Sequence, residues 1–306
     1  MGAPVFGREF SRIPTVVTDM STTTTESTFD VRRLAAFSDN DQGGNPAGVV
    51  LADRLPTEAD MLRIAHRVGY SETAFLAPSG DGFRVRYFAP EAEVPFCGHA
   101  TIASAAVLGE THGPGTYQLF LNDGDISVEV GHTASGNFSA TLQSPPTSTT
   151  DAPGPWLEAM LRHFKLSTDD LDPRFPVRLA SAGAKHLVLG LRRRETLAAM
   201  SYDFEPVREL MQELDVVTVS LIYPESDTLF HARNAFAFGG VVEDPATGAA
   251  AAAFAGYLRD HGRPGPARFT ILQGHDMGSP SRLLVEYGAT PGESVRVTGE
   301  TRALVD

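Results

Sequence analysis

Two stretches decide the fold: VPFCGHATIASAAVL from Val94 to Leu108 and VVEDPATGAAAAAFAGYL from Val241 to Leu258. In each, a Gly turn with acid or base side chains beside it leads into an Ala-rich segment that favours a helix. The two stretches lie about one domain length apart. The chain is therefore predicted to be a duplicated fold.

The start of each predicted helix is a candidate anion site. The first backbone N–H groups of a helix are free, and the positive end of its dipole attracts negative charge. Two such starts at Gly98 and Gly248, facing one cleft, would grip a carboxylate. A neighbouring Glu, His or Asp would then be free to move a proton on the same small molecule.

Composition narrows the class of protein. The chain has 306 residues, 42% of them hydrophobic and 21% charged, which is ordinary for a globular protein of two domains. A net charge of −13 disfavours nucleic acid as a partner. No apolar run reaches the about 18 residues that a membrane span needs, and the N-terminus lacks a signal-peptide pattern. One cysteine excludes an internal disulfide and suits a reducing compartment, so we expect a cytoplasmic protein.

The organisation of the chain follows from its turns and apolar runs. A Ser/Thr-rich segment predicts a disordered tail over residues 1–29, and SPPTSTTDAPGP, from Ser144 to Pro155, predicts a linker. We expect one domain over 30–145 and a second over 146–291, with a last strand near 292–306 that returns to the first domain.

Many short β-like runs surround few helices. One helix is predicted to begin at Thr57, with Asp60 in its first turn. Both Ala-rich helices are apolar nearly all round, which indicates burial inside a curved sheet. The bland alternative is that the alanines merely favour a helix. The prediction is an α+β fold of two pseudo-symmetric domains, each a β-barrel-like sheet wrapped around a central helix.

Six motifs in order resemble the phenazine-biosynthesis PhzF family, a branch of the diaminopimelate-epimerase-like fold. They are GNPAGVVL (Gly44–Leu51), YSETAFL (Tyr70–Leu76), RYFAPEAEVPFCGHAT (Arg86–Thr101), AGAKHLVLG (Ala182–Gly190), VVEDPATGAAAA (Val241–Ala252) and ILQGHDMGSPSRL (Ile271–Leu283). The resemblance covers nearly the whole chain after the tail. It implies two similar domains, an active site between them, no metal, no organic cofactor and a homodimer.

The resemblance implies a catalytic set of Glu72, His99 and Asp244. Glu72 aligns with the family's general acid/base, and its apolar neighbours disfavour the charged carboxylate, which suits proton transfer near neutral pH. His99 lies at a helix start, where the dipole favours the neutral ring. The structural alternatives are a solvated or capping Glu72, a packed His99, and Asp244 as a helix N-cap.

Other residues of the two motifs are expected to bind the substrate. Backbone N–H groups of Gly98, His99, Gly248 and Ala249 would hold its carboxylate. Asn45 would add a polar contact, and Thr247 would line the site.

Cys97 has a secondary place in this prediction. In thiol-dependent racemases of this fold, two thiols act from opposite domains. Here Cys97 occupies the first thiol position but Thr247 occupies the second. We therefore favour a buried packing role for Cys97.

Two positions depart from the family pattern. The family usually has Ser where Ala249 stands, and often has Arg where Ser279 stands. Without the family's hydroxyl at Ala249 and its cation at Ser279, the substrate is expected to differ from that of the typical family member.

The sequence therefore predicts a cofactor-independent isomerase that shifts a proton and a double bond on a small, amino-bearing carboxylate, in secondary metabolism. Glu72 would remove the proton and return it on the same face. Three alternatives stay open: an amino acid racemase or epimerase, a lyase or dehydratase in which Thr247 replaces the second thiol, and a non-catalytic binding protein.

Overall fold

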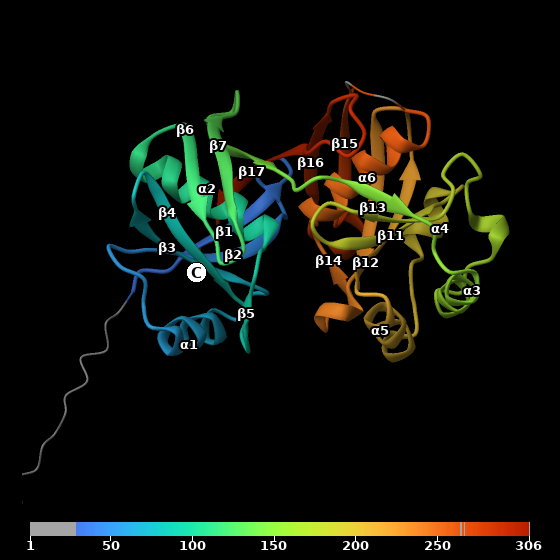
Figure 1. Ribbon diagram of the computed structural model, residues 1–306, viewed down its shortest axis with the longest axis horizontal. Coiled ribbons are helices and arrows are strands. Elements are labelled where there is room, and N and C mark those ends of the chain that lie inside the picture. The colour runs from blue at the N-terminus through green and yellow to red at the C-terminus, as the bar shows by residue number, and fades with distance from the viewer. Residues whose placement is uncertain (1–28, 264, 266, 306) are drawn as a thin grey trace, which may run out of the picture.

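The computed structural model describes residues 29–263, 265 and 267–305 and has two lobes side by side (Figure 1). The tail predicted for residues 1–29 lies outside the described residues up to position 28. The elements of the first lobe are β1 (Arg32–Ser38), β2 (Asn45–Leu51), α1 (Glu58–Val68), β3 (Thr73–Ser79), β4 (Gly82–Phe88), β5 (Glu93–Val94), α2 (Gly98–His112), β6 (Gly115–Phe120), β7 (Asp125–His132) and β8 (Phe138–Gln143).

The second lobe follows the same plan with longer crossovers. Its elements are β9 (Ser148–Thr150), α3 (Gly154–His163), the 3₁₀ turn η1 (Thr168–Asp170), β10 (Arg178–Ser181), β11 (Lys185–Gly190), α4 (Arg194–Ala198), α5 (Phe204–Glu213), β12 (Val216–Pro224), β13 (Leu229–Ala235), η2 (Ala237–Gly239), β14 (Glu243–Asp244), α6 (Gly248–Asp260), β15 (Ala267–Gln273), η3 (His275–Met277) and β16 (Ser281–Tyr287). The last strand is β17 (Val295–Ala303).

Strand pairing confirms the duplication. In the first lobe β2 runs parallel to β3 across α1, and β4 runs parallel to β6 across the β5 hairpin and α2. In the second lobe β11 runs parallel to β12 across α4 and α5, and β13 runs parallel to β15 across the β14 hairpin and α6. The order strand, short hairpin, Ala-rich helix, parallel strand therefore occurs once in each lobe.

β17 joins the lobes. Its first residues pair with β16 of the second lobe, and its central residues pair with β8 of the first, as in Val297↔Leu142. Its end pairs with β1 through Ala303↔Leu34. The last strand thus returns to the first lobe, as expected, while the domain boundaries given above stay a prediction.

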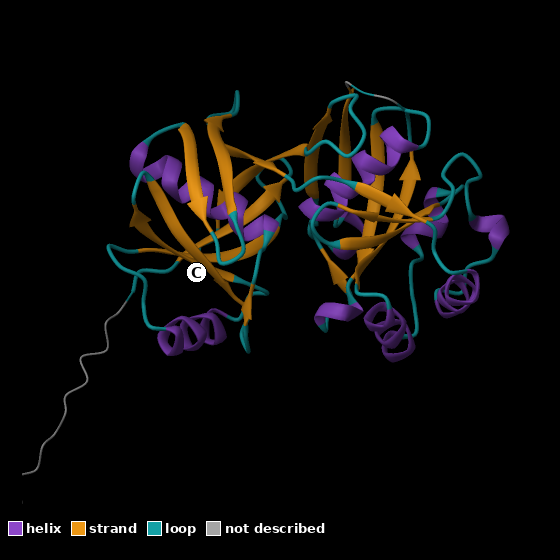
Figure 2. Cartoon of the chain, viewed as in Figure 1, coloured by secondary structure: helices purple, strands orange, loops and turns teal. Residues whose placement is uncertain are grey.

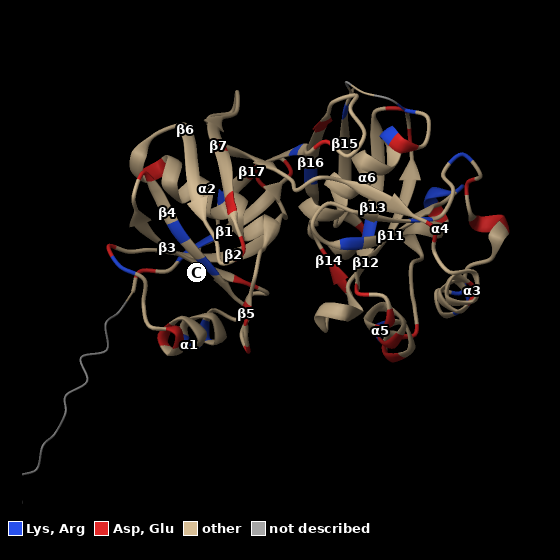
Figure 3. Cartoon of the chain, viewed as in Figure 1, with Lys and Arg blue, Asp and Glu red and all other residues tan. Residues whose placement is uncertain are grey.

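The central helices are buried as predicted. Both are enclosed by strands (Figure 2) and carry few charged residues along their length (Figure 3). In α2 every residue from His99 to Gly109 is buried, and in α6 every residue from Ala250 to Arg259. Alanine dominates both because the enclosing strands leave little room for larger side chains. The fold class is therefore confirmed. No helix among the described residues is long and apolar enough to cross a membrane.

Local sequence signals place α1 where they predicted it. The Thr57 hydroxyl accepts a hydrogen bond from the backbone N–H of Asp60. Gly69 ends the helix at φ 73°, a left-handed conformation that glycine adopts without strain. Met61, Ile64 and Ala65 form the buried face.

The predicted linker from Ser144 to Pro155 is partly wrong. Residues 148–150 form β9, which pairs with β10 through Thr150↔Leu179, and α3 already begins at Gly154. Ser144 and Thr147 are buried. Proline and serine suggested a loop, but β-branched threonines pair readily when a partner strand is at hand, and that partner is distant in sequence.

Candidate active site

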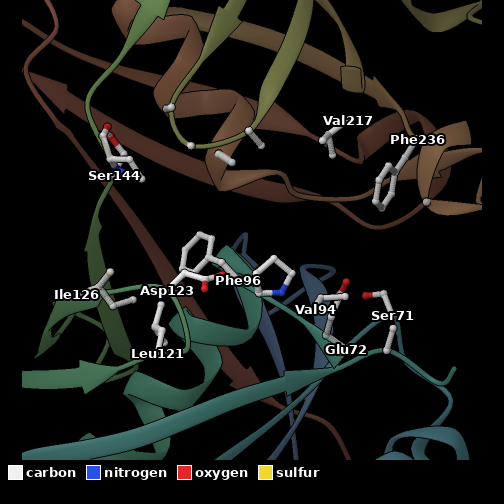
Figure 4. A pocket seen from close by; sticks show the side chains of 18 of the residues that line it. Ser71, Glu72, Val94, Phe96, Leu121, Asp123, Ile126, Ser144, Val217 and Phe236 are labelled. Atoms are coloured by element: carbon white, nitrogen blue, oxygen red, sulfur yellow. Dashed lines mark hydrogen bonds between the residues drawn. The ribbon is translucent and has the colours of Figure 1, made fainter. Parts of the chain in front are cut away.

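A cleft of about 1320 Å³ is lined by residues of both lobes. Figure 4 shows Ser71, Glu72, Val94 and Phe96 along one wall and Val217 and Phe236 along the other. Of the predicted site residues, Glu72 and Ala249 line this cleft. Its titratable side chains all belong to the first lobe, namely Tyr70, Glu72, Glu91, Asp123 and Asp125.

Glu72 lies at the turn before β3 and beside the start of α2. Its carboxylate Oε2 is 3.3 Å from Nε2 of His99, and its side chain is 16% exposed. Oε2 is itself buried, and no hydrogen bond of good geometry reaches it from the described residues. Glu72 thus lines the cleft, while its buried Oε2 faces the His99 ring.

His99 connects the groups of the first lobe. Its Nε2 also lies 3.4 Å from the Ser71 hydroxyl, and its Nδ1 lies 3.4 Å from Cys97 Sγ. The ring is buried, with 8% of its side chain exposed. His99 is therefore placed to orient the Glu72 carboxyl.

Asp244 is held by hydrogen bonds from both lobes. The Asn45 amide donates to Oδ1 over 2.8 Å, and the Thr247 hydroxyl donates to Oδ2. Burial raises the pKa of Asp244 to about 6, and the nearby His99 opposes this shift. Both carboxyl oxygens are occupied, which gives Asp244 a fixed orientation and few free lone pairs.

Gln273 completes this network and was missed from sequence. Its amide donates to the Asp244 backbone carbonyl over 2.7 Å and to Thr247 Oγ1 over 3.1 Å, and its carbonyl accepts from the Thr247 N–H. Gln273 lies within the ILQGHDMGSPSRL motif, which was the only available signal. The residue has 1% exposure, so its role is to hold the turn before α6.

The two helix starts have the predicted form. Gly98 is the first residue of α2 and Gly248 the first of α6. The preceding residues, Cys97 and Thr247, make no side-chain cap hydrogen bond, so neither side chain occupies the first N–H groups. The alternative of Asp244 as an N-cap is wrong, because Asp244 belongs to β14 and Thr247 holds the cap position.

Asn45 begins β2 rather than lying in a turn, and its amide also donates to the Ala246 carbonyl over 3.1 Å. It therefore joins the first lobe to the turn before α6. Ser279 also lies where the lobes meet, since its hydroxyl donates to the Gly44 carbonyl over 2.8 Å. Ser279 itself does not line the cleft, and the effect of lacking an Arg at this position stays a prediction.

Cys97 has the packing environment that was predicted for it. Its exposure is 8%, and burial, followed by the nearby Glu72 carboxylate, raises its pKa well above the ordinary value. Such a thiol is a poor nucleophile. Donor atoms of Glu72, Cys97 and His99 lie within 4.8 Å of one another, close enough to share a metal ion. Binding would require loss of the thiol proton that burial retains, and the absence of a metal stays a prediction.

Phe37 explains the glycine at the start of α6. A Cβ on Gly248 would lie 3.2 Å from the Phe37 ring. Phe37 is fully buried and has φ 62°, which a bulky residue adopts only where its surroundings fix it. At Gly98 the nearest atom to an added Cβ is Leu142 Cδ2, at 3.9 Å. The two helix starts therefore differ in the space beside them.

The two lobes, each with a buried central helix, have the architecture of the epimerase-like fold. Comparison with known proteins agrees. The family model of phenazine biosynthesis-like proteins, PhzC-PhzF, matches residues 34–306. An uncharacterised isomerase of Deinococcus radiodurans is 34% identical, over 87% of this chain and 90% of that protein. The trans-2,3-dihydro-3-hydroxyanthranilate isomerase of Pseudomonas fluorescens is 30% identical, over 86% of this chain and 92% of that protein.

A PhzF-family protein of Bacillus anthracis has the same fold, with a TM-score of 0.81 and 24% identity over 90% of this chain and 97% of that one. The chain belongs to the PhzC-PhzF family. It is an enzyme of the isomerase class.

Proposed function

We propose that this enzyme shifts a proton and a double bond on a small, amino-bearing carboxylate, with Glu72 as the single general acid/base. The observation that carries the proposal is the Glu72 carboxyl, which lines the cleft with Oε2 free of hydrogen bonds and 3.3 Å from His99. A general base must come within hydrogen-bond reach of the proton that it abstracts, and a carboxyl that lines the cleft lies beside a bound substrate.

The residues that the second lobe contributes to the cleft support the proposal that the enzyme uses one general base. Among the described residues, this part of the lining has no titratable side chain. It consists of the small and apolar residues Ala182, Gly183, Ala184, Val217, Phe236, Phe238, Gly239, Val241 and Ala249. One carboxyl would therefore remove the proton from one carbon and return it to another on the same face of the substrate.

The remaining predicted residues would hold the substrate or support the site. The free N–H groups at the starts of α2 and α6 suit its carboxylate. His99 and Asp244 do not line the cleft and would support the site from behind it. His99 would orient the Glu72 carboxyl, and Asp244, fixed by Asn45 and Thr247, would hold the turn before α6. The name of the Pseudomonas fluorescens relative makes an amino-bearing dihydroaromatic acid the first compound to try, which suits a role in secondary metabolism.

The test is incubation in deuterated solvent with trans-2,3-dihydro-3-hydroxyanthranilate and related dihydroaromatic and amino acid carboxylates, followed by NMR. Wild-type enzyme should move a double bond in one of these compounds and place deuterium on a ring carbon. Glu72→Gln should lose about 10²–10⁴ in rate while it still binds the ligand, because the amide keeps the size of the side chain.

Other outcomes identify the alternatives. Exchange at an α-carbon with inversion indicates a racemase or epimerase, and loss of water indicates a lyase. Tight binding of a compound that neither changes nor exchanges indicates a binding protein. Unchanged turnover in Glu72→Gln with a true substrate would refute the proposed role of Glu72.

A further inference from the structure

The cleft extends well beyond Glu72. Its volume of about 1320 Å³ exceeds the about 300–1,000 Å³ of ordinary small-molecule sites. In Figure 4, Ser71 and Glu72 lie at one end, Leu121, Asp123 and Ile126 lie at the other, and Phe96 lies between them. A single six-membered ring held next to Glu72 would leave the far end of the cleft unused.

The walls beyond Glu72 are apolar on both lobes. Phe96, Leu121 and Ile126 belong to the first lobe, and Val217 and Phe236 to the second. The loop after β13 adds two apolar side chains that are unusually exposed for their size: Phe238, at 38%, and Val241, at 46%. Exposed apolar side chains that gather at one cleft indicate contact with a ligand.

The charge of the cleft has one sign. No Lys, Arg or His appears among its described lining residues, whereas Glu91, Asp123 and Asp125 join Glu72 there. Asp123 lies on the turn between β6 and β7, and Asp125 is the first residue of β7. Neither takes part in an ion pair that the described residues form. A second anionic group on the ligand would meet only carboxylates, whereas an amine would find them unpaired.

We propose that the far end of the cleft is a second subsite, the arm subsite, formed by Phe96, Leu121, Asp123, Asp125 and Ile126. It receives an apolar arm of the substrate that ends in an amine. The substrate class is then an extended monocarboxylate whose arm ends in an amine, and phosphorylated and dicarboxylic compounds are excluded. This inference rests on the proposed function for the placement of the substrate carboxylate near Glu72.

The test measures dissociation constants by calorimetry, at low salt, for four non-reacting carboxylates. Benzoate lacks an arm, 4-phenylbutanoate has an apolar arm, 4-[4-(aminomethyl)phenyl]butanoate adds the terminal amine, and 4-(4-carboxyphenyl)butanoate adds a second anion. The apolar arm should tighten binding at least about tenfold over benzoate, since it buries three more methylene groups. The amine should add about two- to fivefold, as is usual for exposed charge pairs, and the dicarboxylate should bind more weakly than 4-phenylbutanoate.

A matched pair of variants locates the amine contact. Asp123→Asn combined with Asp125→Asn should remove the advantage of the amine and leave the affinity for 4-phenylbutanoate unchanged. Asp81→Asn is the control, because Asp81 is an exposed residue of the turn between β3 and β4 and does not line the cleft. All three aspartates are exposed, and a surface position tolerates an amide.

Equal affinity for benzoate and the longer compounds, tightest binding of the dicarboxylate, or an amine advantage that survives in the double variant would each overturn the arm subsite. Binding of none of the four compounds would overturn it too. The deuterium-exchange assay with Glu72→Gln is read independently. Loss of the binding pattern with intact Glu72-dependent exchange removes the arm subsite alone, and the reverse result removes the proposed function alone.

Discussion

The two lobes share one backbone plan and differ in what they bring to the cleft. Each has a short hairpin, a Gly turn and a buried Ala-rich helix. The first lobe adds every titratable side chain of the described lining, whereas the second adds small and apolar residues. The acid of the second copy, Asp244, lies outside the lining and accepts hydrogen bonds on both oxygens.

The difference shows that the two copies of a duplicated fold can keep the same backbone features while their side chains take different roles. Both helix starts keep their free N–H groups, because that property belongs to the backbone and survives changes of side chain. The titratable side chains have diverged, with Glu72 and His99 beside each other in one lobe and Asp244 in a hydrogen-bonded network in the other. The comparison predicts that equivalent changes in the two lobes have unequal effects.

The largest of these effects concerns charge on Asp244. Its pKa rises from 3.8 to about 6 on folding, so the folded state binds the proton more tightly than the unfolded state. The stability contributed by this group is then greatest below about pH 4 and falls as the pH rises to about 6. Asp244→Asn lacks this dependence. The difference in free energy of unfolding, variant minus wild type, should therefore rise by about 3 kcal/mol between about pH 4 and pH 6. Urea denaturation of both proteins at several pH values measures the gain, and a constant difference would contradict it.

A smaller effect is expected at the paired glycines. Gly248→Ala should cost about 1–3 kcal/mol, since its Cβ would press on the Phe37 ring, and that ring also fills the space beside Gly299. Gly98→Ala should be neutral or slightly stabilising, because the site has room and Ala favours a helix. Thermal unfolding of the two variants compares them directly. Equal losses would mean that the helix starts are alike after all.

The smallest effect is expected at Cys97. If its role is packing, Cys97→Ala should keep most of the activity, and alkylation of the wild-type thiol should be slow, because the thiol is buried and protonated. Steady-state kinetics and the rate of reaction with iodoacetamide provide the measurements. A loss of several orders of magnitude in turnover, with the fold intact, would restore the thiol-racemase alternative.

The sequence predicted what local patterns control. The apolar character of residues 98–112 and 248–260 predicted buried central helices, and Thr57 with Asp60 predicted the start of α1. The ordered motifs predicted the family. Contacts between distant segments were out of reach, because no local pattern encodes them: β9 pairs with β10, Gln273 bonds to Asp244, and Ser279 bonds to Gly44.

Within the site, the sequence predicted which residues lie close together but not which of them are exposed to the cleft. Glu72, His99 and Cys97 do meet beside α2. That Glu72 and Ala249 line the cleft while His99 and Asp244 do not depends on how side chains pack. The acidic pair Asp123 and Asp125 could not be predicted as part of the cleft for the same reason, since only the fold brings these residues to it.

The most direct test of the central claim is the face on which the proton returns. The enzyme would be run in deuterated solvent with a substrate carrying a stereospecific label at the carbon that loses its proton, and the configuration of the product would be read by NMR. A single base in the first lobe predicts that deuterium enters on the face from which the proton left. Entry on the opposite face would require a second acid from the other lobe and would contradict the division of work between the lobes.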